Sequence, residues 1–553
     1  MKTAEPALSE WIAPPGAPPL DAGCLSLGDA LSEAARKWGG RQSVVYRHQP
    51  AIADVAWTYA ELNVHAERLA SALIAVGYLP GERIAIWGPN HPEWVLLEYA
   101  IARAGLVLVA LNPLYKLDEL AFALRDSKAA GIFHADRIGD TLPAEVIARA
   151  RMDAPALRHV HAFSSIWTEL IPGAPGEVAP VAPDPDATFM IQYTSGTTGV
   201  PKAVRLSHRA IMTTARNAYR MWGLDEGSRV CPGFPLFHVG GSGNSIPGAA
   251  LVGAAVLPLH IFKPQLTLDI LERERCTTFI GVPTMLIAML DDPSVGGRSL
   301  DALTTIIVGG APVTGDLLAR CQDVFGADVI NCYGQTETCG VTTTTLPTDS
   351  AEKKVRTSGA PLVGVSVAVR NDQGRSVCRG EVGELHYHGP GGMQGYGSVP
   401  ADGDSSDGPA WIASGDLATM DEDGFIAIVG RRKEMIIRGG ENLSPVEIEA
   451  YMKEHEAIRE VAVIGVPDEK YGEVACAVLC VRSGTDITPQ QIRTWCISRI
   501  SRWKVPQYVE FVDEFPMTPS GKIKKFDLQK QMIQRLGLSR DQLIQTSIMD
   551  SQS

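Results

Sequence analysis

The sequence has no apolar run long enough to cross a membrane. The longest such run, at residues 246–259 of 553, is interrupted by Pro247 and Pro258, whereas a spanning helix needs about 20 apolar residues. At the start of the chain (MKTAEPALSEWIAPPGAPPL), prolines occupy the part that would be apolar in a secretory signal peptide. These absences predict a cytoplasmic protein without a transmembrane segment.

Positive charge is scarce as well. The 50 Lys and Arg residues are outnumbered by 63 Asp and Glu residues, which gives a formal net charge of −13. A nucleic-acid-binding protein has to neutralise backbone phosphates with basic side chains. We therefore expect no nucleic-acid partner.

Cysteines with metal-ligand spacing are also lacking. The ten cysteines are scattered, and the nearest pairs, Cys332 with Cys339 and Cys476 with Cys480, do not give a four-ligand zinc pattern. Buried free cysteines behave as small apolar residues. The sequence thus predicts reduced thiols in the core.

The sequence does contain strand-like segments that alternate with helical ones. A helical stretch at residues 93–104 separates strand-like residues 83–88 and 105–112, a pattern typical of parallel sheets covered by helices. After about residue 430 the pattern changes to helices at 445–455 and 489–500 with strands at 461–466 and 475–481. A chain of this length is expected to form several domains, so we predict an N-terminal domain over residues 1–430 and an α+β domain over 431–553.

The usual nucleotide loop, in which four residues separate a Gly from Gly-Lys-Ser or Gly-Lys-Thr, is missing. In its place YTSGTTGVPK (193–202) follows a predicted strand and combines hydroxyls, glycines and Lys202. Residues 203–206 separate Lys202 from Ser207, the expected N-cap of the next helix. The loop would therefore bind phosphate with its own amides, hydroxyls and lysine. Taken alone, the loop leaves a polar surface turn as the alternative.

Other segments strengthen the phosphate-loop interpretation. They are TYAEL (58–62), PLFHVGG (235–241), GGAPV (309–313), YGQTE (333–337), SGDLA (414–418), GRRKEMIIRGGENLSP (430–445) and PSGKIKK (519–525). With YTSGTTGVPK they resemble the adenylate-forming superfamily, which includes acyl- and aryl-CoA synthetases, firefly luciferase and the adenylation domains of peptide synthetases. The resemblance covers nearly the whole chain.

The resemblance implies an α/β fold. Its large N-terminal domain would hold two doubly wound α/β subdomains and a small β-barrel, followed by a small, mobile α+β C-terminal domain. It also implies an AMP-forming acid–thiol ligase that uses ATP, Mg²⁺ and coenzyme A. Such an enzyme converts a carboxylic acid to an acyl-AMP with release of pyrophosphate, and then to an acyl-CoA with release of AMP. A homodimer is left open.

The resemblance implies two sets of site residues. Catalytic roles fall on Lys522, Thr336, Glu337 and His238, and magnesium ligation falls on Glu337 and Thr194. Nucleotide and CoA contacts fall on Thr194, Ser195, Gly196, Thr197, Thr198, Gly199, Lys202, Gly310, Ala311, Pro312, Asn331, Tyr333, Gly334, Gln335, Asp416, Ile428, Arg431, Lys433, Gly439, Gly440 and Glu441.

The chemistry requires residues of these types. Attack of a carboxylate on the α-phosphorus of ATP brings two anions together, and a metal ion on Glu337 and the ammonium of Lys522 would offset their charge. Asp416 can accept hydrogen bonds from both ribose hydroxyls. The resemblance makes Lys433 the pivot of a domain rotation between the two half-reactions. Simpler interpretations remain: Lys522 as a solvated lysine, Glu337 as a turn cap and His238 as a core residue.

Three departures from the family pattern qualify the match. Ala203 replaces a glycine, Ser414 replaces a commoner threonine, and the loop at 396–413 lacks the usual pattern. No acid follows His238 to hold an amino group, and only 28 residues follow Lys525, so we expect neither an amino-acid substrate nor a fused carrier module. The alternatives left open are a ligase that loads a carrier protein, a luciferase-like oxygenase, and a binding protein without turnover.

Overall fold

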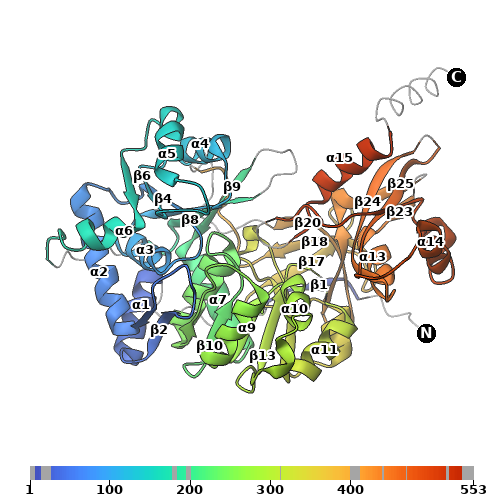
Figure 1. Ribbon diagram of the computed structural model, residues 1–553, viewed down its shortest axis with the longest axis horizontal. Coiled ribbons are helices and arrows are strands. Elements are labelled where there is room, and N and C mark those ends of the chain that lie inside the picture. The colour runs from blue at the N-terminus through green and yellow to red at the C-terminus, as the bar shows by residue number, and fades with distance from the viewer. Residues whose placement is uncertain are drawn as a thin grey trace. The chain divides into compact units, whose positions relative to one another are not determined.

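The computed structural model describes residues 7–13, 26–176, 184–194, 201–311, 313–398, 411–438, 441–468, 470–518 and 522–538 (Figure 1). The chain divides into two compact units. We call Trp11–Val367 with Tyr387–Ile412 the large unit, and Met1–Glu10 with Ala368–His386 and Ala413–Ser553 the small unit. The small unit includes strands from before residue 430; the boundary at 430/431 stays a prediction about domain movement.

The first sheet of the large unit has nine strands, and its central strands from β2 to β14 are parallel. Its order is β16 (Ala360–Pro361), β15 (Thr343–Thr344), β14 (Asp328–Tyr333), β13 (Thr305–Gly309), β12 (Thr278–Gly281), β10 (Arg229–Pro232), β11 (Ala255–Val256), β2 (Gln42–Tyr46) and β3 (Val55–Thr58). Fully buried Phe279, Leu286 and Ile306 belong to its core. Such a sheet places loops at the carboxyl ends of adjacent strands, where ligands bind in α/β folds.

The second sheet of the large unit has seven strands. Its order is β19 (Gly395–Tyr396), β9 (Lys202–Ser207), β8 (Thr188–Thr194), β5 (Val107–Leu111), β4 (Arg83–Trp87), β6 (Gly131–His134) and β7 (His159–Ala162). Strands β8, β5, β4, β6 and β7 are parallel, whereas β9 and β19 each run antiparallel to their neighbour. These strands confirm the segments predicted at 83–88 and 105–112. Both faces of β8 are buried, because the successive residues Met190 and Ile191 are both buried, as expected for a strand inside a covered sheet.

Helices separate these strands along the chain. They are α1 (Leu27–Trp38), α2 (Tyr59–Val76), α3 (Pro92–Arg103), α4 (Leu117–Asp126), α5 (Pro143–Ala150), the short α6 (Phe163–Ser165), α7 (His208–Met221), α8 (Ile246–Val252), α9 (Pro264–Arg273), α10 (Pro283–Leu290), α11 (Gly315–Phe325) and α12 (Ala351–Arg356). Thr58 and Glu61 of the TYAEL motif form a capping box at the start of α2. The Thr and Glu of this motif therefore have a structural role, because their side chains satisfy backbone N–H groups that the first helical turn leaves free.

The small unit contains a five-stranded sheet and the C-terminal sheet. The first has the order β1 (Glu10–Trp11), β17 (Ser366–Arg370), β18 (Gly383–His388), β20 (Ile412–Met420) and β21 (Ile426–Arg431). The second has the order β23 (Glu441–Leu443), β22 (Ile436–Arg438), β25 (Gly472–Val481) and β24 (Ile458–Asp468), and β26 (Tyr508–Phe511) also pairs with β25. Three helices accompany the second sheet: α13 (Pro445–Lys453), α14 (Pro489–Ile497) and α15 (Lys525–Arg535).

The C-terminal sheet is buried on both faces. Val461 and Val463 of β24 share a core with α13 and α14, while Ala462 and Ile464 of the same strand share another core with Leu528 of α15. Successive side chains of a strand point to opposite faces, so helices lie on both sides. This arrangement confirms the α+β pattern predicted for the C-terminal region.

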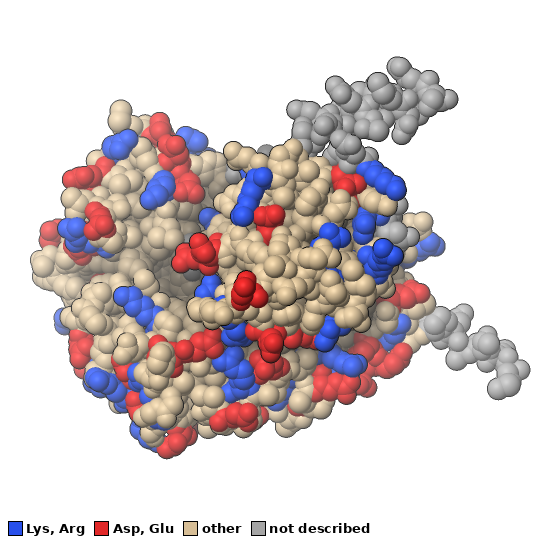
Figure 2. Space-filling model, turned by 45° about the vertical axis from the view of Figure 1, so that its right-hand side comes forward, with Lys and Arg blue, Asp and Glu red and all other residues tan. Residues whose placement is uncertain are grey.

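The face drawn in Figure 2 carries charges of both signs, and the described cysteines agree with the prediction of thiols in the core. On the face drawn in Figure 2, acidic and basic side chains are interspersed. Seven of the nine cysteines within the described ranges are buried, and all nine are free thiols. No helix in the described part of the chain combines the length and hydropathy of a membrane span.

Candidate functional site

The hairpin of β8 and β9 carries the candidate phosphate loop. Thr194 ends β8 and Lys202 begins β9, and the two residues face each other across the ladder, where the Thr194 hydroxyl donates to the Lys202 carbonyl at 3.4 Å. Ser195, Gly196, Thr197, Thr198 and Gly199 lie outside the described residues. The hairpin therefore brings together the two residues that flank the loop.

The chain does not run from this loop directly into a helix. Residues 203–206, whose conformation the sequence left unassigned, belong to β9, and only then does Ser207 cap α7 by accepting from the Ala210 amide at 3.1 Å. The predicted N-cap is confirmed. The phosphate ligands that we predict from this loop thus depend on its own groups, with no contribution from the positive end of a helix dipole.

The candidate adenine segments follow two adjacent strands. β13 and β14 are parallel, and Gly309 at the end of β13 pairs with Cys332 near the end of β14. Gly310 follows with φ of +82°, a conformation that favours glycine. Gly310, Ala311 and Tyr333 therefore lie at the same edge of the sheet, as the motifs predicted, and Pro312 lies outside the described residues.

Four neighbouring candidates lie in the turn after β14. Gly334 and Gln335 lead into a 3₁₀ turn at Thr336–Thr338, which carries Thr336 and Glu337. Asn331 is different from these, because it is buried and its amide donates to the Thr357 carbonyl at 2.9 Å. The structure therefore gives Asn331 a role in packing β14 against the following segment.

The Glu337 carboxylate contacts a residue that the sequence interpretation did not include. The Tyr396 hydroxyl donates to Glu337 Oε1 at 2.9 Å, and Lys202 Nζ lies 4.9 Å from the centre of the Tyr396 ring. Burial, with Glu337 adding to it, raises the pKa of the phenol. The signal in the sequence was the Gly395-Tyr396 pair, which resembled the family pattern at the start of the loop at 396–413.

His238 is held by its own turn. Its Nδ1 accepts from the Gly240 amide at 3.1 Å, and its ring stacks on Phe234 with centroids 5.7 Å apart. A neutral ring that accepts at Nδ1 carries its proton on Nε2. A Cβ on Gly241 would lie 2.5 Å from the Pro235 carbonyl oxygen, so this glycine serves close backbone packing rather than room for a substrate.

In the small unit, Asp416 and Arg431 face each other on β20 and β21. The Arg431 Nε lies 2.9 Å from Asp416 Oδ1, and the aspartate side chain is 4% exposed. The Asp416 amide donates to the Ser414 hydroxyl at 3.0 Å, so the serine supplies the same oxygen as the commoner threonine. Ile428 lies on β21, where it pairs with Ala418.

Lys522 belongs electrostatically to the same group of residues. Protein atoms packed around it desolvate its ammonium and lower its pKa, although the side chain still reaches solvent; Arg431 lowers the pKa further, whereas Asp416 and Glu434 raise it. The backbone amide of Lys522 donates a hydrogen bond to the Thr518 hydroxyl at 2.9 Å. The structure thus brings together Asp416, Arg431 and Lys522, as predicted.

The two sequence neighbours of Lys433 form ion pairs with different parts of the small unit. Arg432 donates to Glu384 at 2.9 Å and to Asp372 at 2.7 Å, both beside the five-stranded sheet. Glu434 lies 3.5 Å from the Nζ of Lys525 on α15. Residues 439 and 440 lie outside the described part, and Glu441 begins β23.

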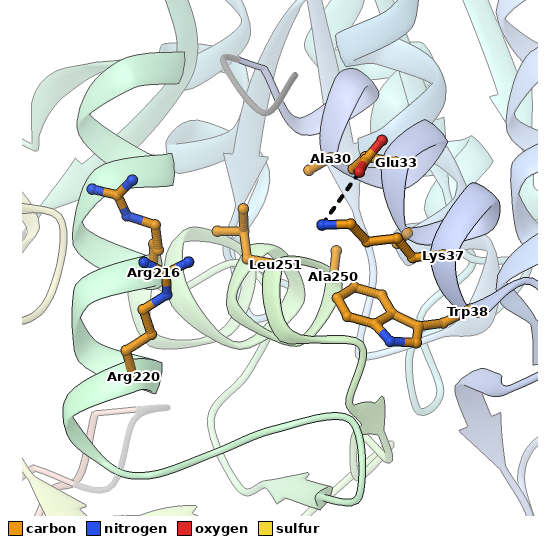
Figure 3. A pocket seen from close by; sticks show the side chains of 9 residues that line it. Ala30, Glu33, Lys37, Trp38, Arg216, Arg220, Ala250 and Leu251 are labelled. Carbon is orange, nitrogen blue, oxygen red and sulfur yellow. Dashed lines mark ion pairs between the residues drawn. The ribbon is translucent and has the colours of Figure 1, made fainter. Parts of the chain in front are cut away.

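Two hollows elsewhere do not coincide with these residues. Figure 3 shows a cavity of about 50 Å³ among α1, α7 and α8, where Glu33 and Lys37 form an ion pair at 3.3 Å. An open hollow of about 570 Å³ lies beside Arg229, Arg273 and Arg275 at the amino-terminal ends of β10 and β12. The first is small for a ligand site, and the second is at the edge of the sheet opposite to the one where α/β folds bind ligands.

Comparison with known proteins agrees with the motifs. The AMP-binding enzyme family matches residues 31–397, and the AMP-binding enzyme C-terminal domain matches residues 447–522. A putative acyl-CoA synthetase of Bacillus subtilis, YngI, is 34% identical over 94% of this chain and 99% of its own length. The human mitochondrial medium-chain acyl-CoA ligase ACSF2 is 30% identical over 93% of this chain and 88% of its own.

A solved structure of a coenzyme A synthetase is also similar to this chain. The o-succinylbenzoate coenzyme A synthetase of Bacillus subtilis, in complex with ATP and magnesium ion, superposes with a TM-score of 0.78 at 28% identity, over 90% of this chain and 98% of its own. The two relatives and this structure match over 94%, 93% and 90% of the chain. The chain therefore belongs to the AMP-binding enzyme family, within the adenylate-forming superfamily that its motifs resemble.

Proposed function

We propose that the protein is an AMP-forming acyl-CoA synthetase. In the first half-reaction a carboxylate oxygen of the acid attacks the α-phosphorus of ATP, the acyl-AMP forms and pyrophosphate leaves. In the second, the thiol sulfur of coenzyme A attacks the acyl carbonyl carbon, the thioester forms, the thiol proton is released and AMP leaves. The observation that carries the proposal is the group of Asp416, Arg431 and Lys522 in the small unit, together with Lys202 and Glu337 in the large unit.

The large-unit residues suit the leaving phosphates. Lys202 would neutralise the charge that develops on the outgoing pyrophosphate, and Thr336 would contact the α-phosphate. The adjacent carboxyl ends of β13 and β14 support an adenine site at Gly310, Ala311 and Tyr333.

Magnesium fits the same residues. Mg²⁺ prefers oxygen ligands and is usually bound by one or two protein carboxylates plus substrate phosphates. Within the described residues, no group of three or more His, Cys, Asp or Glu side chains is placed to hold a metal by itself, so a single carboxylate with nucleotide oxygens is the arrangement that suits this chain. We propose Glu337 and Thr194 as the protein ligands; the bound ion offsets the negative charge of the phosphates.

The small-unit residues suit the ribose and the transition state. Asp416 can accept from both ribose hydroxyls, and its charge is already balanced by Arg431. Lys522 is a cation beside this pair and would stabilise the charge on the α-phosphate as the acid attacks. These roles require the two units to act on one nucleotide.

The acid and the acceptor are the finer parts of the proposal. No acidic residue follows His238 to hold an amino group, which supports a plain carboxylic acid. The name of the human relative gives medium-chain acyl groups for that protein, and we propose medium-chain aliphatic acids as the first substrates to test. We propose coenzyme A as the acceptor because both curated relatives are named as acyl-CoA enzymes.

The cellular compartment stays a prediction. The human relative is named as mitochondrial, whereas the sequence interpretation favoured the cytoplasm.

The direct test is CoA-dependent AMP release over straight-chain acids of graded length, with benzoate and cyclohexanecarboxylate as ring acids. We expect AMP release to require ATP, Mg²⁺, CoA and an acid together. Release of pyrophosphate without any CoA-dependent step, but with transfer to a purified acyl carrier protein, would favour the carrier-loading alternative. No product with any acid would favour a binding protein without turnover.

A further inference from the structure

Tyr396, which is 46% exposed, connects the two sheets of the large unit at the candidate site. Its strand, β19, is at the edge of the seven-stranded sheet, whereas its hydroxyl bonds to Glu337, which follows β14 of the nine-stranded sheet. The face of its ring meets Lys202 at the start of β9. One side chain therefore contacts both the lysine proposed for the phosphates and the carboxylate proposed for magnesium.

The backbone that carries Tyr396 is firmly anchored to the phosphate-loop hairpin. Tyr396 pairs with Val204 of β9, and the Gly397 amide donates to the Ala203 carbonyl at 2.9 Å. The guanidinium of Arg205, which is 1% exposed, donates to the carbonyls of Tyr396 and Gly397 at 3.1 and 2.9 Å. A buried, charged donor to two carbonyls makes this a strong local attachment.

The same segment is attached to the turn that carries Glu337. The Met393 amide donates to the Glu337 carbonyl oxygen at 2.8 Å. Glu337 is thus bound twice, through its backbone to Met393 and through its side chain to Tyr396. The four residues from Met393 to Tyr396 therefore connect the 3₁₀ turn to β9 directly.

We propose that Tyr396 is a positioning residue of the ATP site, which fixes the Glu337 carboxylate relative to Lys202 before nucleotide and metal arrive. The inference rests on the proposed function, since it takes Glu337 as a magnesium ligand and Lys202 as a phosphate ligand. Side chains that hydrogen-bond to a metal ligand orient it. The phenol is neutral, so it orients the carboxylate without cancelling the charge that attracts a cation, and a carboxylate that accepts one bond retains lone pairs for a metal.

Two substitutions separate the two contacts of Tyr396. Tyr396→Phe removes the hydroxyl and keeps the ring under Lys202, whereas Tyr396→Leu removes both the hydroxyl and the aromatic face. Tyr451→Phe on α13 is a matched control, because this tyrosine is 36% exposed and belongs to the small unit. Thermal unfolding of each variant shows that it is folded before it is compared.

The test is ATP binding by isothermal titration calorimetry without acid or CoA, once with excess Mg²⁺ and once with EDTA. For Tyr396→Phe we expect the gain in ATP affinity due to Mg²⁺ to fall roughly tenfold. This is the smaller of the usual losses when a residue that orients a metal ligand is removed. The ATP affinity in EDTA should be unchanged. Tyr396→Leu should also weaken binding in EDTA, and Tyr451→Phe should match the wild-type protein. In the pyrophosphate-exchange assay, Tyr396→Phe should raise the half-saturating Mg²⁺ concentration more than it lowers kcat.

Two results would overturn the inference. Equal Mg²⁺ dependence of Tyr396→Phe and wild-type protein would make the bond to Glu337 a surface contact without consequence. Tighter Mg²⁺-dependent binding by Tyr396→Phe would mean that the hydroxyl competes with the metal. Glu337→Gln separates this failure from failure of the proposed function: if it abolishes the Mg²⁺ effect while Tyr396→Phe does not, the metal role stands and the positioning role falls.

Discussion

The two groups of candidate residues hold their carboxylates in different ways. In the small unit, Asp416 is buried and faces the guanidinium of Arg431 at 2.9 Å across two adjacent strands. In the large unit, Glu337 is half-buried and accepts from the neutral phenol of Tyr396. The difference indicates which ligand each carboxylate can bind. The charge of Asp416 is balanced by arginine, which suits neutral ribose hydroxyls, whereas the charge of Glu337 is not balanced by its neutral donor, which suits a metal ion.

Within the small-unit group, Lys522 should be needed for the first half-reaction alone. Lys522→Ala removes the cation proposed for the α-phosphate, and we expect acid-dependent pyrophosphate exchange to fall about 10³-fold, the larger of the usual losses for a single transition-state donor. Thioester formation from purified acyl-AMP and CoA should change little. Lys530→Ala, on the exposed face of α15 beside Phe526, is the matched control. Equal losses in both half-reactions would place Lys522 in general substrate binding.

The segment next to the small-unit group should matter for the second half-reaction. Arg432 and Glu434, on either side of Lys433, are each held by an ion pair. A rotation of the backbone at Lys433 would therefore reorient the residues after it relative to those before it without breaking these bonds. Lys433→Pro fixes φ, and we expect thioester formation to slow about 10²-fold, the size of loss that misplaced groups produce, while pyrophosphate exchange stays nearly intact.

Two separate assays check this expectation. The first follows pyrophosphate exchange, and the second follows thioester formation from purified acyl-AMP. If both rates fell by the same factor, the idea that the C-terminal domain predicted at residues 431–553 alternates between two arrangements would be wrong.

A third carboxylate belongs to neither group, and we expect it to lower the stability of the fold. Glu98 on α3 is fully buried, both of its oxygens lack a hydrogen-bond partner within the described structure, and burial raises its pKa well above the ordinary value. Glu98→Met should raise the free energy of unfolding by about 2 kcal/mol, since a buried polar group without a partner is removed. Calorimetric or denaturant unfolding of the two proteins measures the difference.

The pH dependence of that difference has a definite sign. The folded pKa of Glu98 is raised, so its cost is absent below the unfolded-state pKa of about 4.3 and grows as the pH rises toward the folded pKa. The gain from Glu98→Met should therefore be larger at pH 7 than at pH 4.5, and activity should be unchanged. A gain that is constant with pH would mean that Glu98 keeps an ordinary pKa.

The smallest expected effect concerns the charge of Lys522. Its pKa is lowered by desolvation and by Arg431, so the cation should be lost, and adenylation with it, at a lower pH than for an ordinary lysine. Glu434→Gln removes a charge that raises this pKa and should move the basic limb of the adenylation profile further down, by less than one pH unit, a shift that corresponds to about 1 kcal/mol. A limb that moved upward would show that Glu434 does not act on Lys522.

Much of this fold could be predicted from the sequence because its signals are local. The apolar runs of β4 and β5, the capping hydroxyl of Ser207 and the change of pattern near residue 430 each depend on residues close together in the chain. The motif residues Asp416, Arg431 and Lys522 could be grouped because the family resemblance linked segments that lie far apart.

The role of Tyr396 could not be predicted in this way. Its contact with Glu337 depends on β19 pairing with β9 after nearly two hundred intervening residues, and no local pattern records that pairing. The strand between Lys202 and Ser207 was missed as well, because its six residues show no clear alternation. Asn331 was assigned to the nucleotide site by the family resemblance alone; its amide donates to the Thr357 carbonyl, and its contact with the nucleotide stays a prediction.

The most direct test of the account is acid-dependent exchange of radiolabelled pyrophosphate into ATP by the full-length protein with Mg²⁺ and a series of straight-chain carboxylic acids. We expect exchange that requires an acid, that is lost in Lys522→Ala and that persists in Lys433→Pro. Exchange that is equal in wild-type protein and Lys522→Ala, or protein that binds ATP but gives no exchange with any acid, would contradict it.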